Sequence, residues 1–371
     1  MSVIAYALRN LRRNKLRNIL TLLGVAAGMS VLMASVSVTE NFKSQLDDII
    51  DDTGADIMIQ SLRATTPMLS RISRQDLNAI QSMDDISSTS SIIMGFLKTP
   101  WAPYFLILGL SSTEELAGQL RLLQGRWFEP QAKEIVLGYL CARQLAYAPG
   151  DAITLSAGAE FTVTGIYSFG YPMADGAAVM DIRTARTLLN RDDSVNMVLA
   201  AISEDVDPDD LMHRFNSDFP HLYASSGKDF VSEVRFFDSV ELFTWILSMV
   251  SLITCCLVVV NTLVMSVSER IKEIGILLAI GWTRFMIYKT ILYESIVICL
   301  AGTLAGGSLA VIALWLLQGS RSLGLGLIPV SISLDIVLVG CGLALLLGLI
   351  CSLYPALLTR KMTPAQALRH E

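Results

Sequence analysis

Four long stretches of this chain carry no charged residue, and they constrain its fold more than any other feature. They are residues 18–39, 242–268, 295–320 and 336–359. A helix needs roughly 20 apolar residues to cross a hydrocarbon core of about 30 Å. Each stretch reaches that length, which is unusual for a buried helix of a soluble protein. The sequence therefore predicts a membrane protein with four transmembrane α-helices.

The composition agrees with this assignment. Of the 371 residues, 53% are apolar and 17% are charged, whereas about 25% charged is usual in soluble proteins. Disorder is excluded, because disordered chains are poor in apolar residues. A cleaved signal peptide is the alternative for the first stretch, but its apolar run exceeds the usual length of about 7–15 residues. We therefore expect a retained first span.

Charge is divided unevenly along the chain. Residues 41–240 hold 15 basic and 27 acidic residues, a net charge of −12, although the whole chain carries only −6. Basic residues instead gather before the first span, between the second and third, and after the fourth. Because loops rich in lysine and arginine stay in the cytoplasm, we expect both termini there. The acidic segment of about 200 residues is then outside the membrane.

This large insertion contains short elements of both kinds. Strand patterns occupy residues 56–60, 104–110, 152–155, 161–166, 177–181 and 197–202, and helical patterns occupy 73–81, 183–189 and 208–215. Residues 157–160 join two of the strands as a predicted hairpin. A regular βαβ alternation is missing from the pattern. We therefore predict a large α+β extracytoplasmic domain inserted between the first and second spans.

Helical patterns continue beyond the first two spans. Residues 40–52 and 231–243 both keep apolar residues on one helical face. Two explanations are open. The segments are stiff stalks that carry motion out of the membrane, or they are ordinary helix ends packed on the domain.

Motifs for catalysis and metal binding are absent from the sequence. It contains no GxxxxGK[ST], so we expect no ATP hydrolysis by a P-loop of this chain. His213, His221 and His370 are too scattered for a metal site. Glu294 and Asp335 lie at span edges rather than at mid-membrane, which argues against an ion-coupled carrier. We predict no catalytic, cofactor-binding or metal-binding residue.

Small residues recur inside the spans at helical spacing. They are Gly24 and Gly28 in the first span, Gly302 and Gly306 in the third, and Gly340 and Gly348 in the fourth. Such residues let helices approach closely in lipid. The pattern predicts close packing within the bundle or a dimer interface, and it does not choose between them.

The loop between the second and third spans is the most specific segment. It predicts a short amphipathic helix with an apolar stripe of Ile271, Ile274, Leu277 and Leu278 and an opposite side of Arg270, Lys272 and Glu273. A helix of this kind rests on lipid head groups or docks in a groove of a partner protein. Composition leaves both options open.

Three motifs resemble the MacB/FtsX family of ABC transporter permeases. The stretch ERIKEIGILLAIGWTR (269–284) resembles the coupling helix of that family. The stretch from LRNLRRNKLR to LTLLG (8–24) resembles its N-terminal amphipathic helix and first span, and YPA with TPAQALR (354–369) resembles its C-terminal pattern. Parts of residues 125–166 resemble its extracytoplasmic domain. One difference is Leu278, where the family often has a basic residue.

The resemblance, taken together with the charge-free stretches, gives a domain order as well as a fold. In chain order it gives a cytoplasmic amphipathic N-terminal helix (1–17), a first span (18–39), an extracytoplasmic α+β domain with stalk helices at both ends (40–240), a second span (241–268), a cytoplasmic coupling-helix loop (269–290), a third span (291–320), a short outer loop (321–335), a fourth span (336–359) and a cytoplasmic tail (360–371).

The resemblance also implies a function. The chain would be the non-catalytic permease subunit of an ATP-driven ABC export or extraction system, multi-pass in a bacterial cytoplasmic (inner) membrane. ATP and Mg²⁺ would be held by a separate ABC ATPase present in two copies, and no cofactor by this chain. A second permease copy would complete a homodimer or a related heterodimer in contact with membrane lipid. The resemblance leaves room for a periplasmic adaptor protein and gives no role to nucleic acid.

In this family, ATPase motion is thought to pass through the coupling helix and stalks to the outer domain. The residues implied in coupling are Glu269, Arg270, Glu273, Ile274, Gly275, Ala279, Gly281 and Arg284. Glu273 suits charged contacts, and Gly275 and Gly281 suit close backbone approach. The alternative for these three is helix termination and packing.

A second function from another class stays open at this point. An FtsX-like regulator would activate an external cell-wall hydrolase without moving cargo. The size of the inserted domain, about 200 residues, resembles the exporter branch more than the smaller regulator domain.

Overall fold

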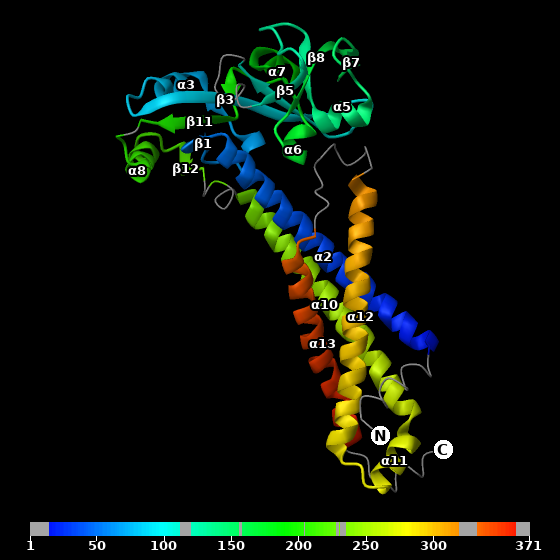
Figure 1. The fold of residues 1–371 in the computed structure, drawn as a ribbon. Helices are drawn as coiled ribbons and strands as arrows, with labels where there is room; N and C mark the ends of the chain where they lie inside the picture. The colour runs from blue at the N-terminus through cyan, green and yellow to red at the C-terminus, as the bar shows by residue number, and fades with distance from the viewer. Residues whose placement is uncertain are drawn as a thin grey trace. The chain divides into compact units, whose positions relative to one another are not determined.

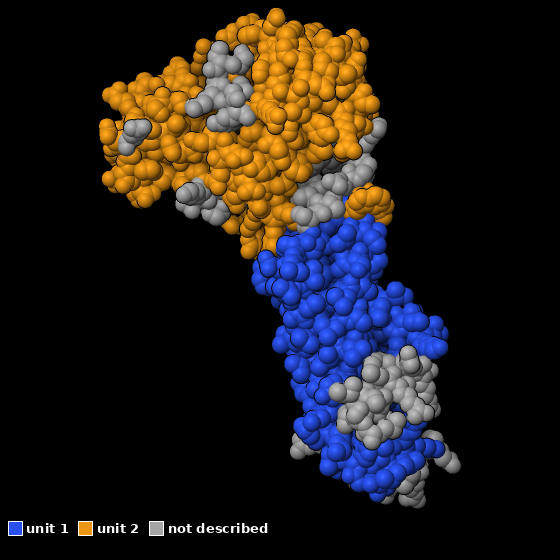
Figure 2. Space-filling view, viewed as in Figure 1, with its two compact units in different colours: residues 1–38, 243–314, 331–371 blue, residues 39–242, 315–330 orange. Residues whose placement is uncertain are grey.

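The computed structural model describes residues 15–111, 120–155, 158–203, 205–227, 230, 235–318 and 332–360. The chain divides into two compact units (Figure 2), one of residues 1–38, 243–314 and 331–371 and one of residues 39–242 and 315–330. Most of the predicted N-terminal helix, most of the outer loop and nearly all of the C-terminal tail lie outside the described residues.

The first unit is built from long helices (Figure 1). They are α2 (Lys15–Asp52), α10 (Arg235–Glu269), α12 (Arg284–Gln318) and α13 (Leu334–Arg360). Each contains a stretch that is long and apolar enough to cross a membrane. The prediction of four transmembrane helices is confirmed. A short fifth helix, α11 (Ile271–Ala279), connects α10 to α12.

The glycines of the spans lie where helices of this unit meet. A Cβ added to Gly306 would come within 2.7 Å of the Ala26 carbonyl oxygen, and one added to Gly348 within 3.2 Å of Ile296 Cα. The same construction places Gly24 against Val258, Gly28 against Cys255, Gly302 against Val25 and Gly340 against Met33. All six predicted small residues therefore serve contacts inside one chain, because only a missing side chain leaves room for the neighbouring helix.

The second unit contains a ten-stranded mixed sheet with the order β12-β1-β11-β3-β4-β9-β6-β8-β5, and β7 pairs with β8. The strands are β1 (Ile57–Ser61), β3 (Ile86–Leu97), β4 (Phe105–Leu110), β5 (Arg121–Gly125), β6 (Glu134–Gly138), β7 (Ala152–Thr154), β8 (Glu160–Ser168), β9 (Ala178–Asp181), β11 (Met197–Ile202) and β12 (Leu222–Ser226). A separate pair joins β2 (Ile72–Ser73) and β10 (Ser194–Val195). Among the described strand pairs of the large sheet, only β4–β9 and β6–β8 run parallel.

Helices complete this unit. They are α3 (Arg74–Gln81), α5 (Tyr139–Leu145), α6 (Pro172–Asp175), α7 (Ile182–Leu188) and α8 (Pro208–Asp218), with a 3-10 turn at Pro67–Leu69. The mixture of antiparallel strands and interspersed helices confirms the predicted α+β domain. Its longest strand, β3, pairs with β11 over residues 86–92 and with β4 over residues 93–97, so it joins the two halves of the sheet.

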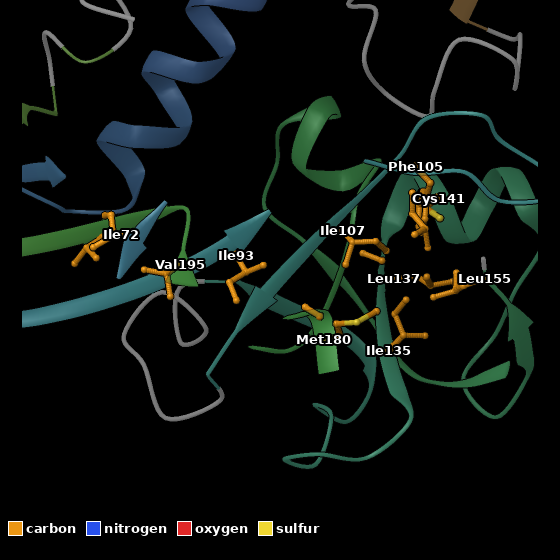
Figure 3. Close-up of a cluster of buried hydrophobic side chains, with 14 of the residues drawn as sticks. Ile72, Ile93, Phe105, Ile107, Ile135, Leu137, Cys141, Leu155, Met180 and Val195 are labelled. Atoms are coloured by element: carbon orange, nitrogen blue, oxygen red, sulfur yellow. The ribbon is translucent and has the colours of Figure 1, made fainter. Parts of the chain in front are cut away.

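Apolar side chains cover both faces of the sheet. On one face, Ile107 from β4, Ile135 and Leu137 from β6, and Met180 from β9 gather in one buried cluster (Figure 3). Their neighbours along the same strands, such as Val136, point the other way into a second cluster. Because side chains alternate along a strand, each strand contributes to both layers.

The ends of α2 and α10 that belong to this unit pack on the second cluster. Ile50 of α2 and Phe237 of α10 are buried in it, and the rings of Phe42 and Phe237 lie 5.8 Å apart. Lys43 Nζ lies 2.6 Å from Glu241 Oε2 and ties the two helices together. The helical patterns beyond the spans are therefore unbroken extensions of α2 and α10 whose ends pack on the domain, and their role as stalks that carry motion stays a prediction.

Candidate functional site

The candidate site is the short helix α11, and it begins at a one-residue corner. Helix α10 ends at Glu269, and Arg270 then leaves the helical conformation, with φ −113° and ψ 19°. The carbonyl of Arg270 accepts the first backbone hydrogen bond of α11, from Ile274 N at 2.9 Å. One residue therefore separates the second span from α11.

The end of α11 is fixed by a left-handed glycine. Gly281 has φ +103°, and the amide of Trp282 donates to the carbonyl of Leu277 at 3.0 Å. This is the hydrogen-bond pattern of a Schellman cap, which favours glycine at the left-handed position. An added Cβ at Gly281 would meet nothing within 4 Å. The left-handed backbone conformation that ends α11 therefore accounts for a glycine at position 281, without any contact to a partner.

The two sides of α11 differ from the sequence prediction. Ile274 and Gly275 are buried, and Leu278 and Trp282 pack against the core of the helical unit. Ile274 and Leu278 of the predicted apolar stripe therefore face this chain's own helices and do not offer a free surface to lipid or a partner. Ile271 and Leu277 of the same stripe are half-buried.

Another side of α11 is exposed, and we call it the coupling face. It consists of Lys272, Ile276, Ala279 and Ile280, which are spaced four, three and one residues apart on one side of the helix. Ile276 is 48% exposed and Ile280 is 73% exposed. Two isoleucines beside a lysine thus form an uncovered apolar surface at the tip of the loop.

The residues that follow the turn are exposed as well. Thr283 Oγ1 accepts a hydrogen bond from Met286 N at 3.3 Å and caps the start of α12. Arg284, Phe285 and Met286 are all exposed in this first turn. Lys289 Nζ lies 4.7 Å from the centre of the Phe285 ring, a cation–π contact on the surface.

Arg270 is not on an exposed polar side, contrary to the sequence prediction. Its side chain is only 10% exposed and forms an ion pair with Glu294 of α12, whose side chain is 3% exposed. The Nη2 and Nη1 atoms of Arg270 lie 3.0 Å and 3.3 Å from the two carboxylate oxygens of Glu294. The reason is electrostatic: a carboxylate at the start of the third span needs a partner when it is buried.

Three other residues, Glu269, Glu273 and Arg284, were predicted from the sequence to take part in coupling. Glu269 is exposed and pairs with Arg17 of α2, Glu273 is half-buried, and Arg284 is exposed at the start of α12. Among the described residues, no group of three or more histidine, cysteine, aspartate or glutamate residues could hold a metal ion.

Comparison with known proteins assigns the family. The MacB-like periplasmic core domain matches residues 19–217, and the FtsX-like permease C-terminal domain matches residues 245–364. The chain belongs to the MacB/FtsX family of ABC transporter permeases. The α+β domain between its first two spans is therefore the extracytoplasmic domain of this family, and the protein is a multi-pass protein of the inner membrane.

Similar proteins are found with full and partial overlap. An uncharacterized ABC transporter permease of Methanocaldococcus jannaschii is 21% identical, covering 100% of this chain and 98% of the relative. The macrolide export ATP-binding/permease protein MacB of Bdellovibrio bacteriovorus is 24% identical, over 98% of this chain and 61% of the relative. The pyoverdine export ATP-binding/permease protein PvdT of Pseudomonas aeruginosa is 25% identical, over 96% and 56%. This chain thus spans about 60% of the two export proteins.

Solved structures also align with part of the chain. The periplasmic region of MacB from Actinobacillus actinomycetemcomitans aligns over 49% of this chain and 94% of that structure, with 16% identity and a TM-score of 0.37. The extracellular domain of the transporter YknZ from Gram-positive bacteria aligns over 46% and 99%, with 11% identity and a TM-score of 0.36.

Two features of the permease site escaped the sequence reasoning. The outward direction of Ile276 and Ile280 was missed, because a run of apolar residues around a helix does not say which side its neighbours cover. The partner of Glu294 was missed too, although a carboxylate beside an apolar span was a usable indication of a buried ion pair.

Proposed function

We propose that this permease is the transmembrane subunit of an ATP-driven export or extraction system and that its coupling face docks on a separate ABC ATPase. The observation that carries the proposal is the exposed pair Ile276 and Ile280 on a helix whose other side packs against this chain's own helices. A helix that presents apolar residues at this spacing fits a groove of a partner protein. Burial of these side chains against a partner would be favourable, because contiguous exposed apolar surface marks interaction sites.

Charge around this face supports a protein partner in the cytoplasm. Lys272 flanks the isoleucines, and Arg284 follows the turn. Both would lie on the cytoplasmic side with the termini, as the distribution of basic residues favours. ATP and Mg²⁺ belong to the ATPase in this proposal, and the active complex has two ATPases and two permease copies, identical or related.

Transmission toward the extracytoplasmic domain follows from helix continuity. The corner at Arg270 joins α11 to α10, which is helical back to Arg235, and α2 is one helix from Lys15 to Asp52. A helix transmits displacement along its length without an intervening loop. Motion of the ATPase would thus reach the helix ends that pack on the extracytoplasmic sheet, where cargo or an adaptor protein is handled.

A charged substitution on the coupling face tests this proposal. We expect Ile280→Asp to reduce copurification of the ABC ATPase at least about tenfold, because the substitution replaces an apolar anchor with a carboxylate that docking would bury. Permease-stimulated ATP hydrolysis in nanodiscs should fall in parallel. The matched control is Leu69→Asp, because Leu69 is similarly exposed, at 64%, in the extracytoplasmic domain.

Equal ATPase recovery with Ile280→Asp and with the control would refute docking at this face. The regulator alternative is tested separately, with the same complex in proteoliposomes. An export system removes cargo from the membrane or cytoplasm on ATP addition, whereas a regulator stimulates an added cell-wall hydrolase and moves nothing.

A further inference from the structure

The corner between α10 and α11 holds two adjacent residues of opposite charge, and each binds a different span. Glu269 accepts a hydrogen bond from Arg17 Nη1 of α2. Arg270 donates two hydrogen bonds to Glu294 of α12. The base of α11 is therefore tied to the first and third spans as well as to its own helix.

Hydrogen bonds to two residues fix the orientation of the Arg270 side chain. Its Nη2 also donates to Ser266 Oγ at 2.7 Å, and its Nε donates to the carbonyl of Ser266 at 3.1 Å. The guanidinium thus bridges the last turn of α10 and Glu294, which lies ten residues after the first residue of α12. Paired planar groups of this kind fix geometry more strongly than a single lysine contact.

Glu269 continues a line of contacts along α2. Thr21 Oγ1 lies 2.8 Å from Thr262 Oγ1, which precedes Glu269 by seven residues, or about two turns of α10. Gly24 and Gly28 then meet Val258 and Cys255 of the same helix. The line of contacts between α2 and α10 thus ends at the ion pair with Glu269, immediately before the corner.

We propose that Glu269 and Arg270 form a two-sided clamp that makes α2, α10 and α12 move as one body when α11 is displaced. This inference rests on the proposed function, because it assumes that an ATPase moves α11. It assigns both residues as positioning residues inside the permease rather than as contacts with the ATPase. It also adds Arg17, Ser266 and Glu294 to the coupling machinery.

A clamp differs from a merely stabilising ion pair in what an apolar replacement does. Removing one charge leaves the other buried and uncompensated, which destabilises the protein whatever the pair is for. Replacing both with apolar residues of similar size commonly restores stability. It does not restore a directional tie between two helices, so a clamp and a stabilising contact predict different double variants.

The test uses Arg270→Met with Glu294→Leu in the full-length permease and its ABC ATPase in nanodiscs. We expect the double variant to fold and to bind the ATPase as the unsubstituted permease does. Permease-stimulated ATP hydrolysis should fall about tenfold, a coupling effect of ordinary size. The matched control is Gly342→Ala on α13, because an added Cβ there meets nothing within 4 Å.

A distance measurement reports the clamp directly. Spin labels are placed at Met265→Cys on α10 and Lys289→Cys on α12, both exposed positions, after the native cysteines are replaced. The distance between the labels should stay constant between nucleotide-free and vanadate-trapped states in the clamped protein. In the double variant it should change with nucleotide.

An unchanged label distance and full ATP hydrolysis in the double variant would overturn the clamp. Failure of the unsubstituted permease to bind any ABC ATPase would instead overturn the proposed function, so the two failures are distinct. If the double variant does not fold, the more exposed arm gives the answer. Arg17→Glu and Glu269→Arg should each lower hydrolysis, and the two together should restore it; no effect of either single change would refute the clamp.

Discussion

At the scale of single residues, one phenol–carboxylate contact joins α2 to the extracytoplasmic domain. Tyr171 Oη donates to Asp52 Oδ2 at 2.7 Å, beside a contact from Met173 N to Gln45 Oε1 at 3.3 Å. The hydrogen bond to Asp52, with burial and neighbouring carboxylates, raises the pKa of Tyr171 to about 12. The last turns of α2 are therefore bound to the segment around α6.

The pH dependence of this contact follows from the raised pKa. Because the folded value exceeds the usual value of about 10, the contact stabilises the domain fully below pH 10 and loses this effect as pH rises through about 12. We expect Asp52→Asn to lower the pKa of Tyr171 toward 10, since the amide carries no charge. The measurement is tyrosinate absorbance, as the difference between each protein and its Tyr171→Phe counterpart. An unaltered titration in Asp52→Asn, or an equal shift in the exposed control Asp218→Asn, would contradict the contact.

The sequence predicted the helix and turn of the coupling loop better than it predicted which way the side chains of the loop point. The helix over 271–279 and its termination near Gly281 follow from local signals, namely apolar spacing and a left-handed glycine. The inward position of Arg270 depends on Glu294, which lies 24 residues later and on another helix. A contact between distant positions cannot be inferred from the spacing around either one.

At the scale of elements, local patterns located half of the described strands and most of the described helices. Ser73 accepts a hydrogen bond from Asp76 N at 3.1 Å and caps α3, as the predicted helix over 73–81 requires. Strand β3 was missed because its first half reads ISSTSS, and serine carries no apolar alternation. It forms nevertheless, because pairing with β11 and β4 on either side supplies the stabilisation that its side chains lack.

Helix packing in the membrane unit gives a prediction at this scale. Gly306→Ala should destabilise the unit by about 1–3 kcal/mol, the usual effect of overpacking, because the new Cβ would lie 2.7 Å from the Ala26 carbonyl oxygen. Gly342→Ala has the same chemistry in open space and should leave stability unchanged or slightly raised. Thermal unfolding in detergent compares the two. Equal melting temperatures would show that Gly306 is not a packing position.

At the scale of the whole molecule, the net charge of −6 is the sum of two opposed parts. The segment 41–240 carries −12, and the remainder of the chain carries +6. This division predicted the insertion of an external domain between the first and second spans, and the fold confirms that domain. How the helix ends bind the sheet could not be predicted, because it depends on surfaces formed only after the sheet assembles.

The coupling face is where the permease account is tested most directly. A photo-cross-linking amino acid at Ile280 should form a covalent adduct with the ABC ATPase in native membranes, and the same amino acid at Leu69, a comparably exposed residue, should not. Mass spectrometry of the adduct would identify the ATPase and the groove that receives α11. An ATPase adduct from Leu69, or none from Ile280 in an actively hydrolysing complex, would contradict docking through α11.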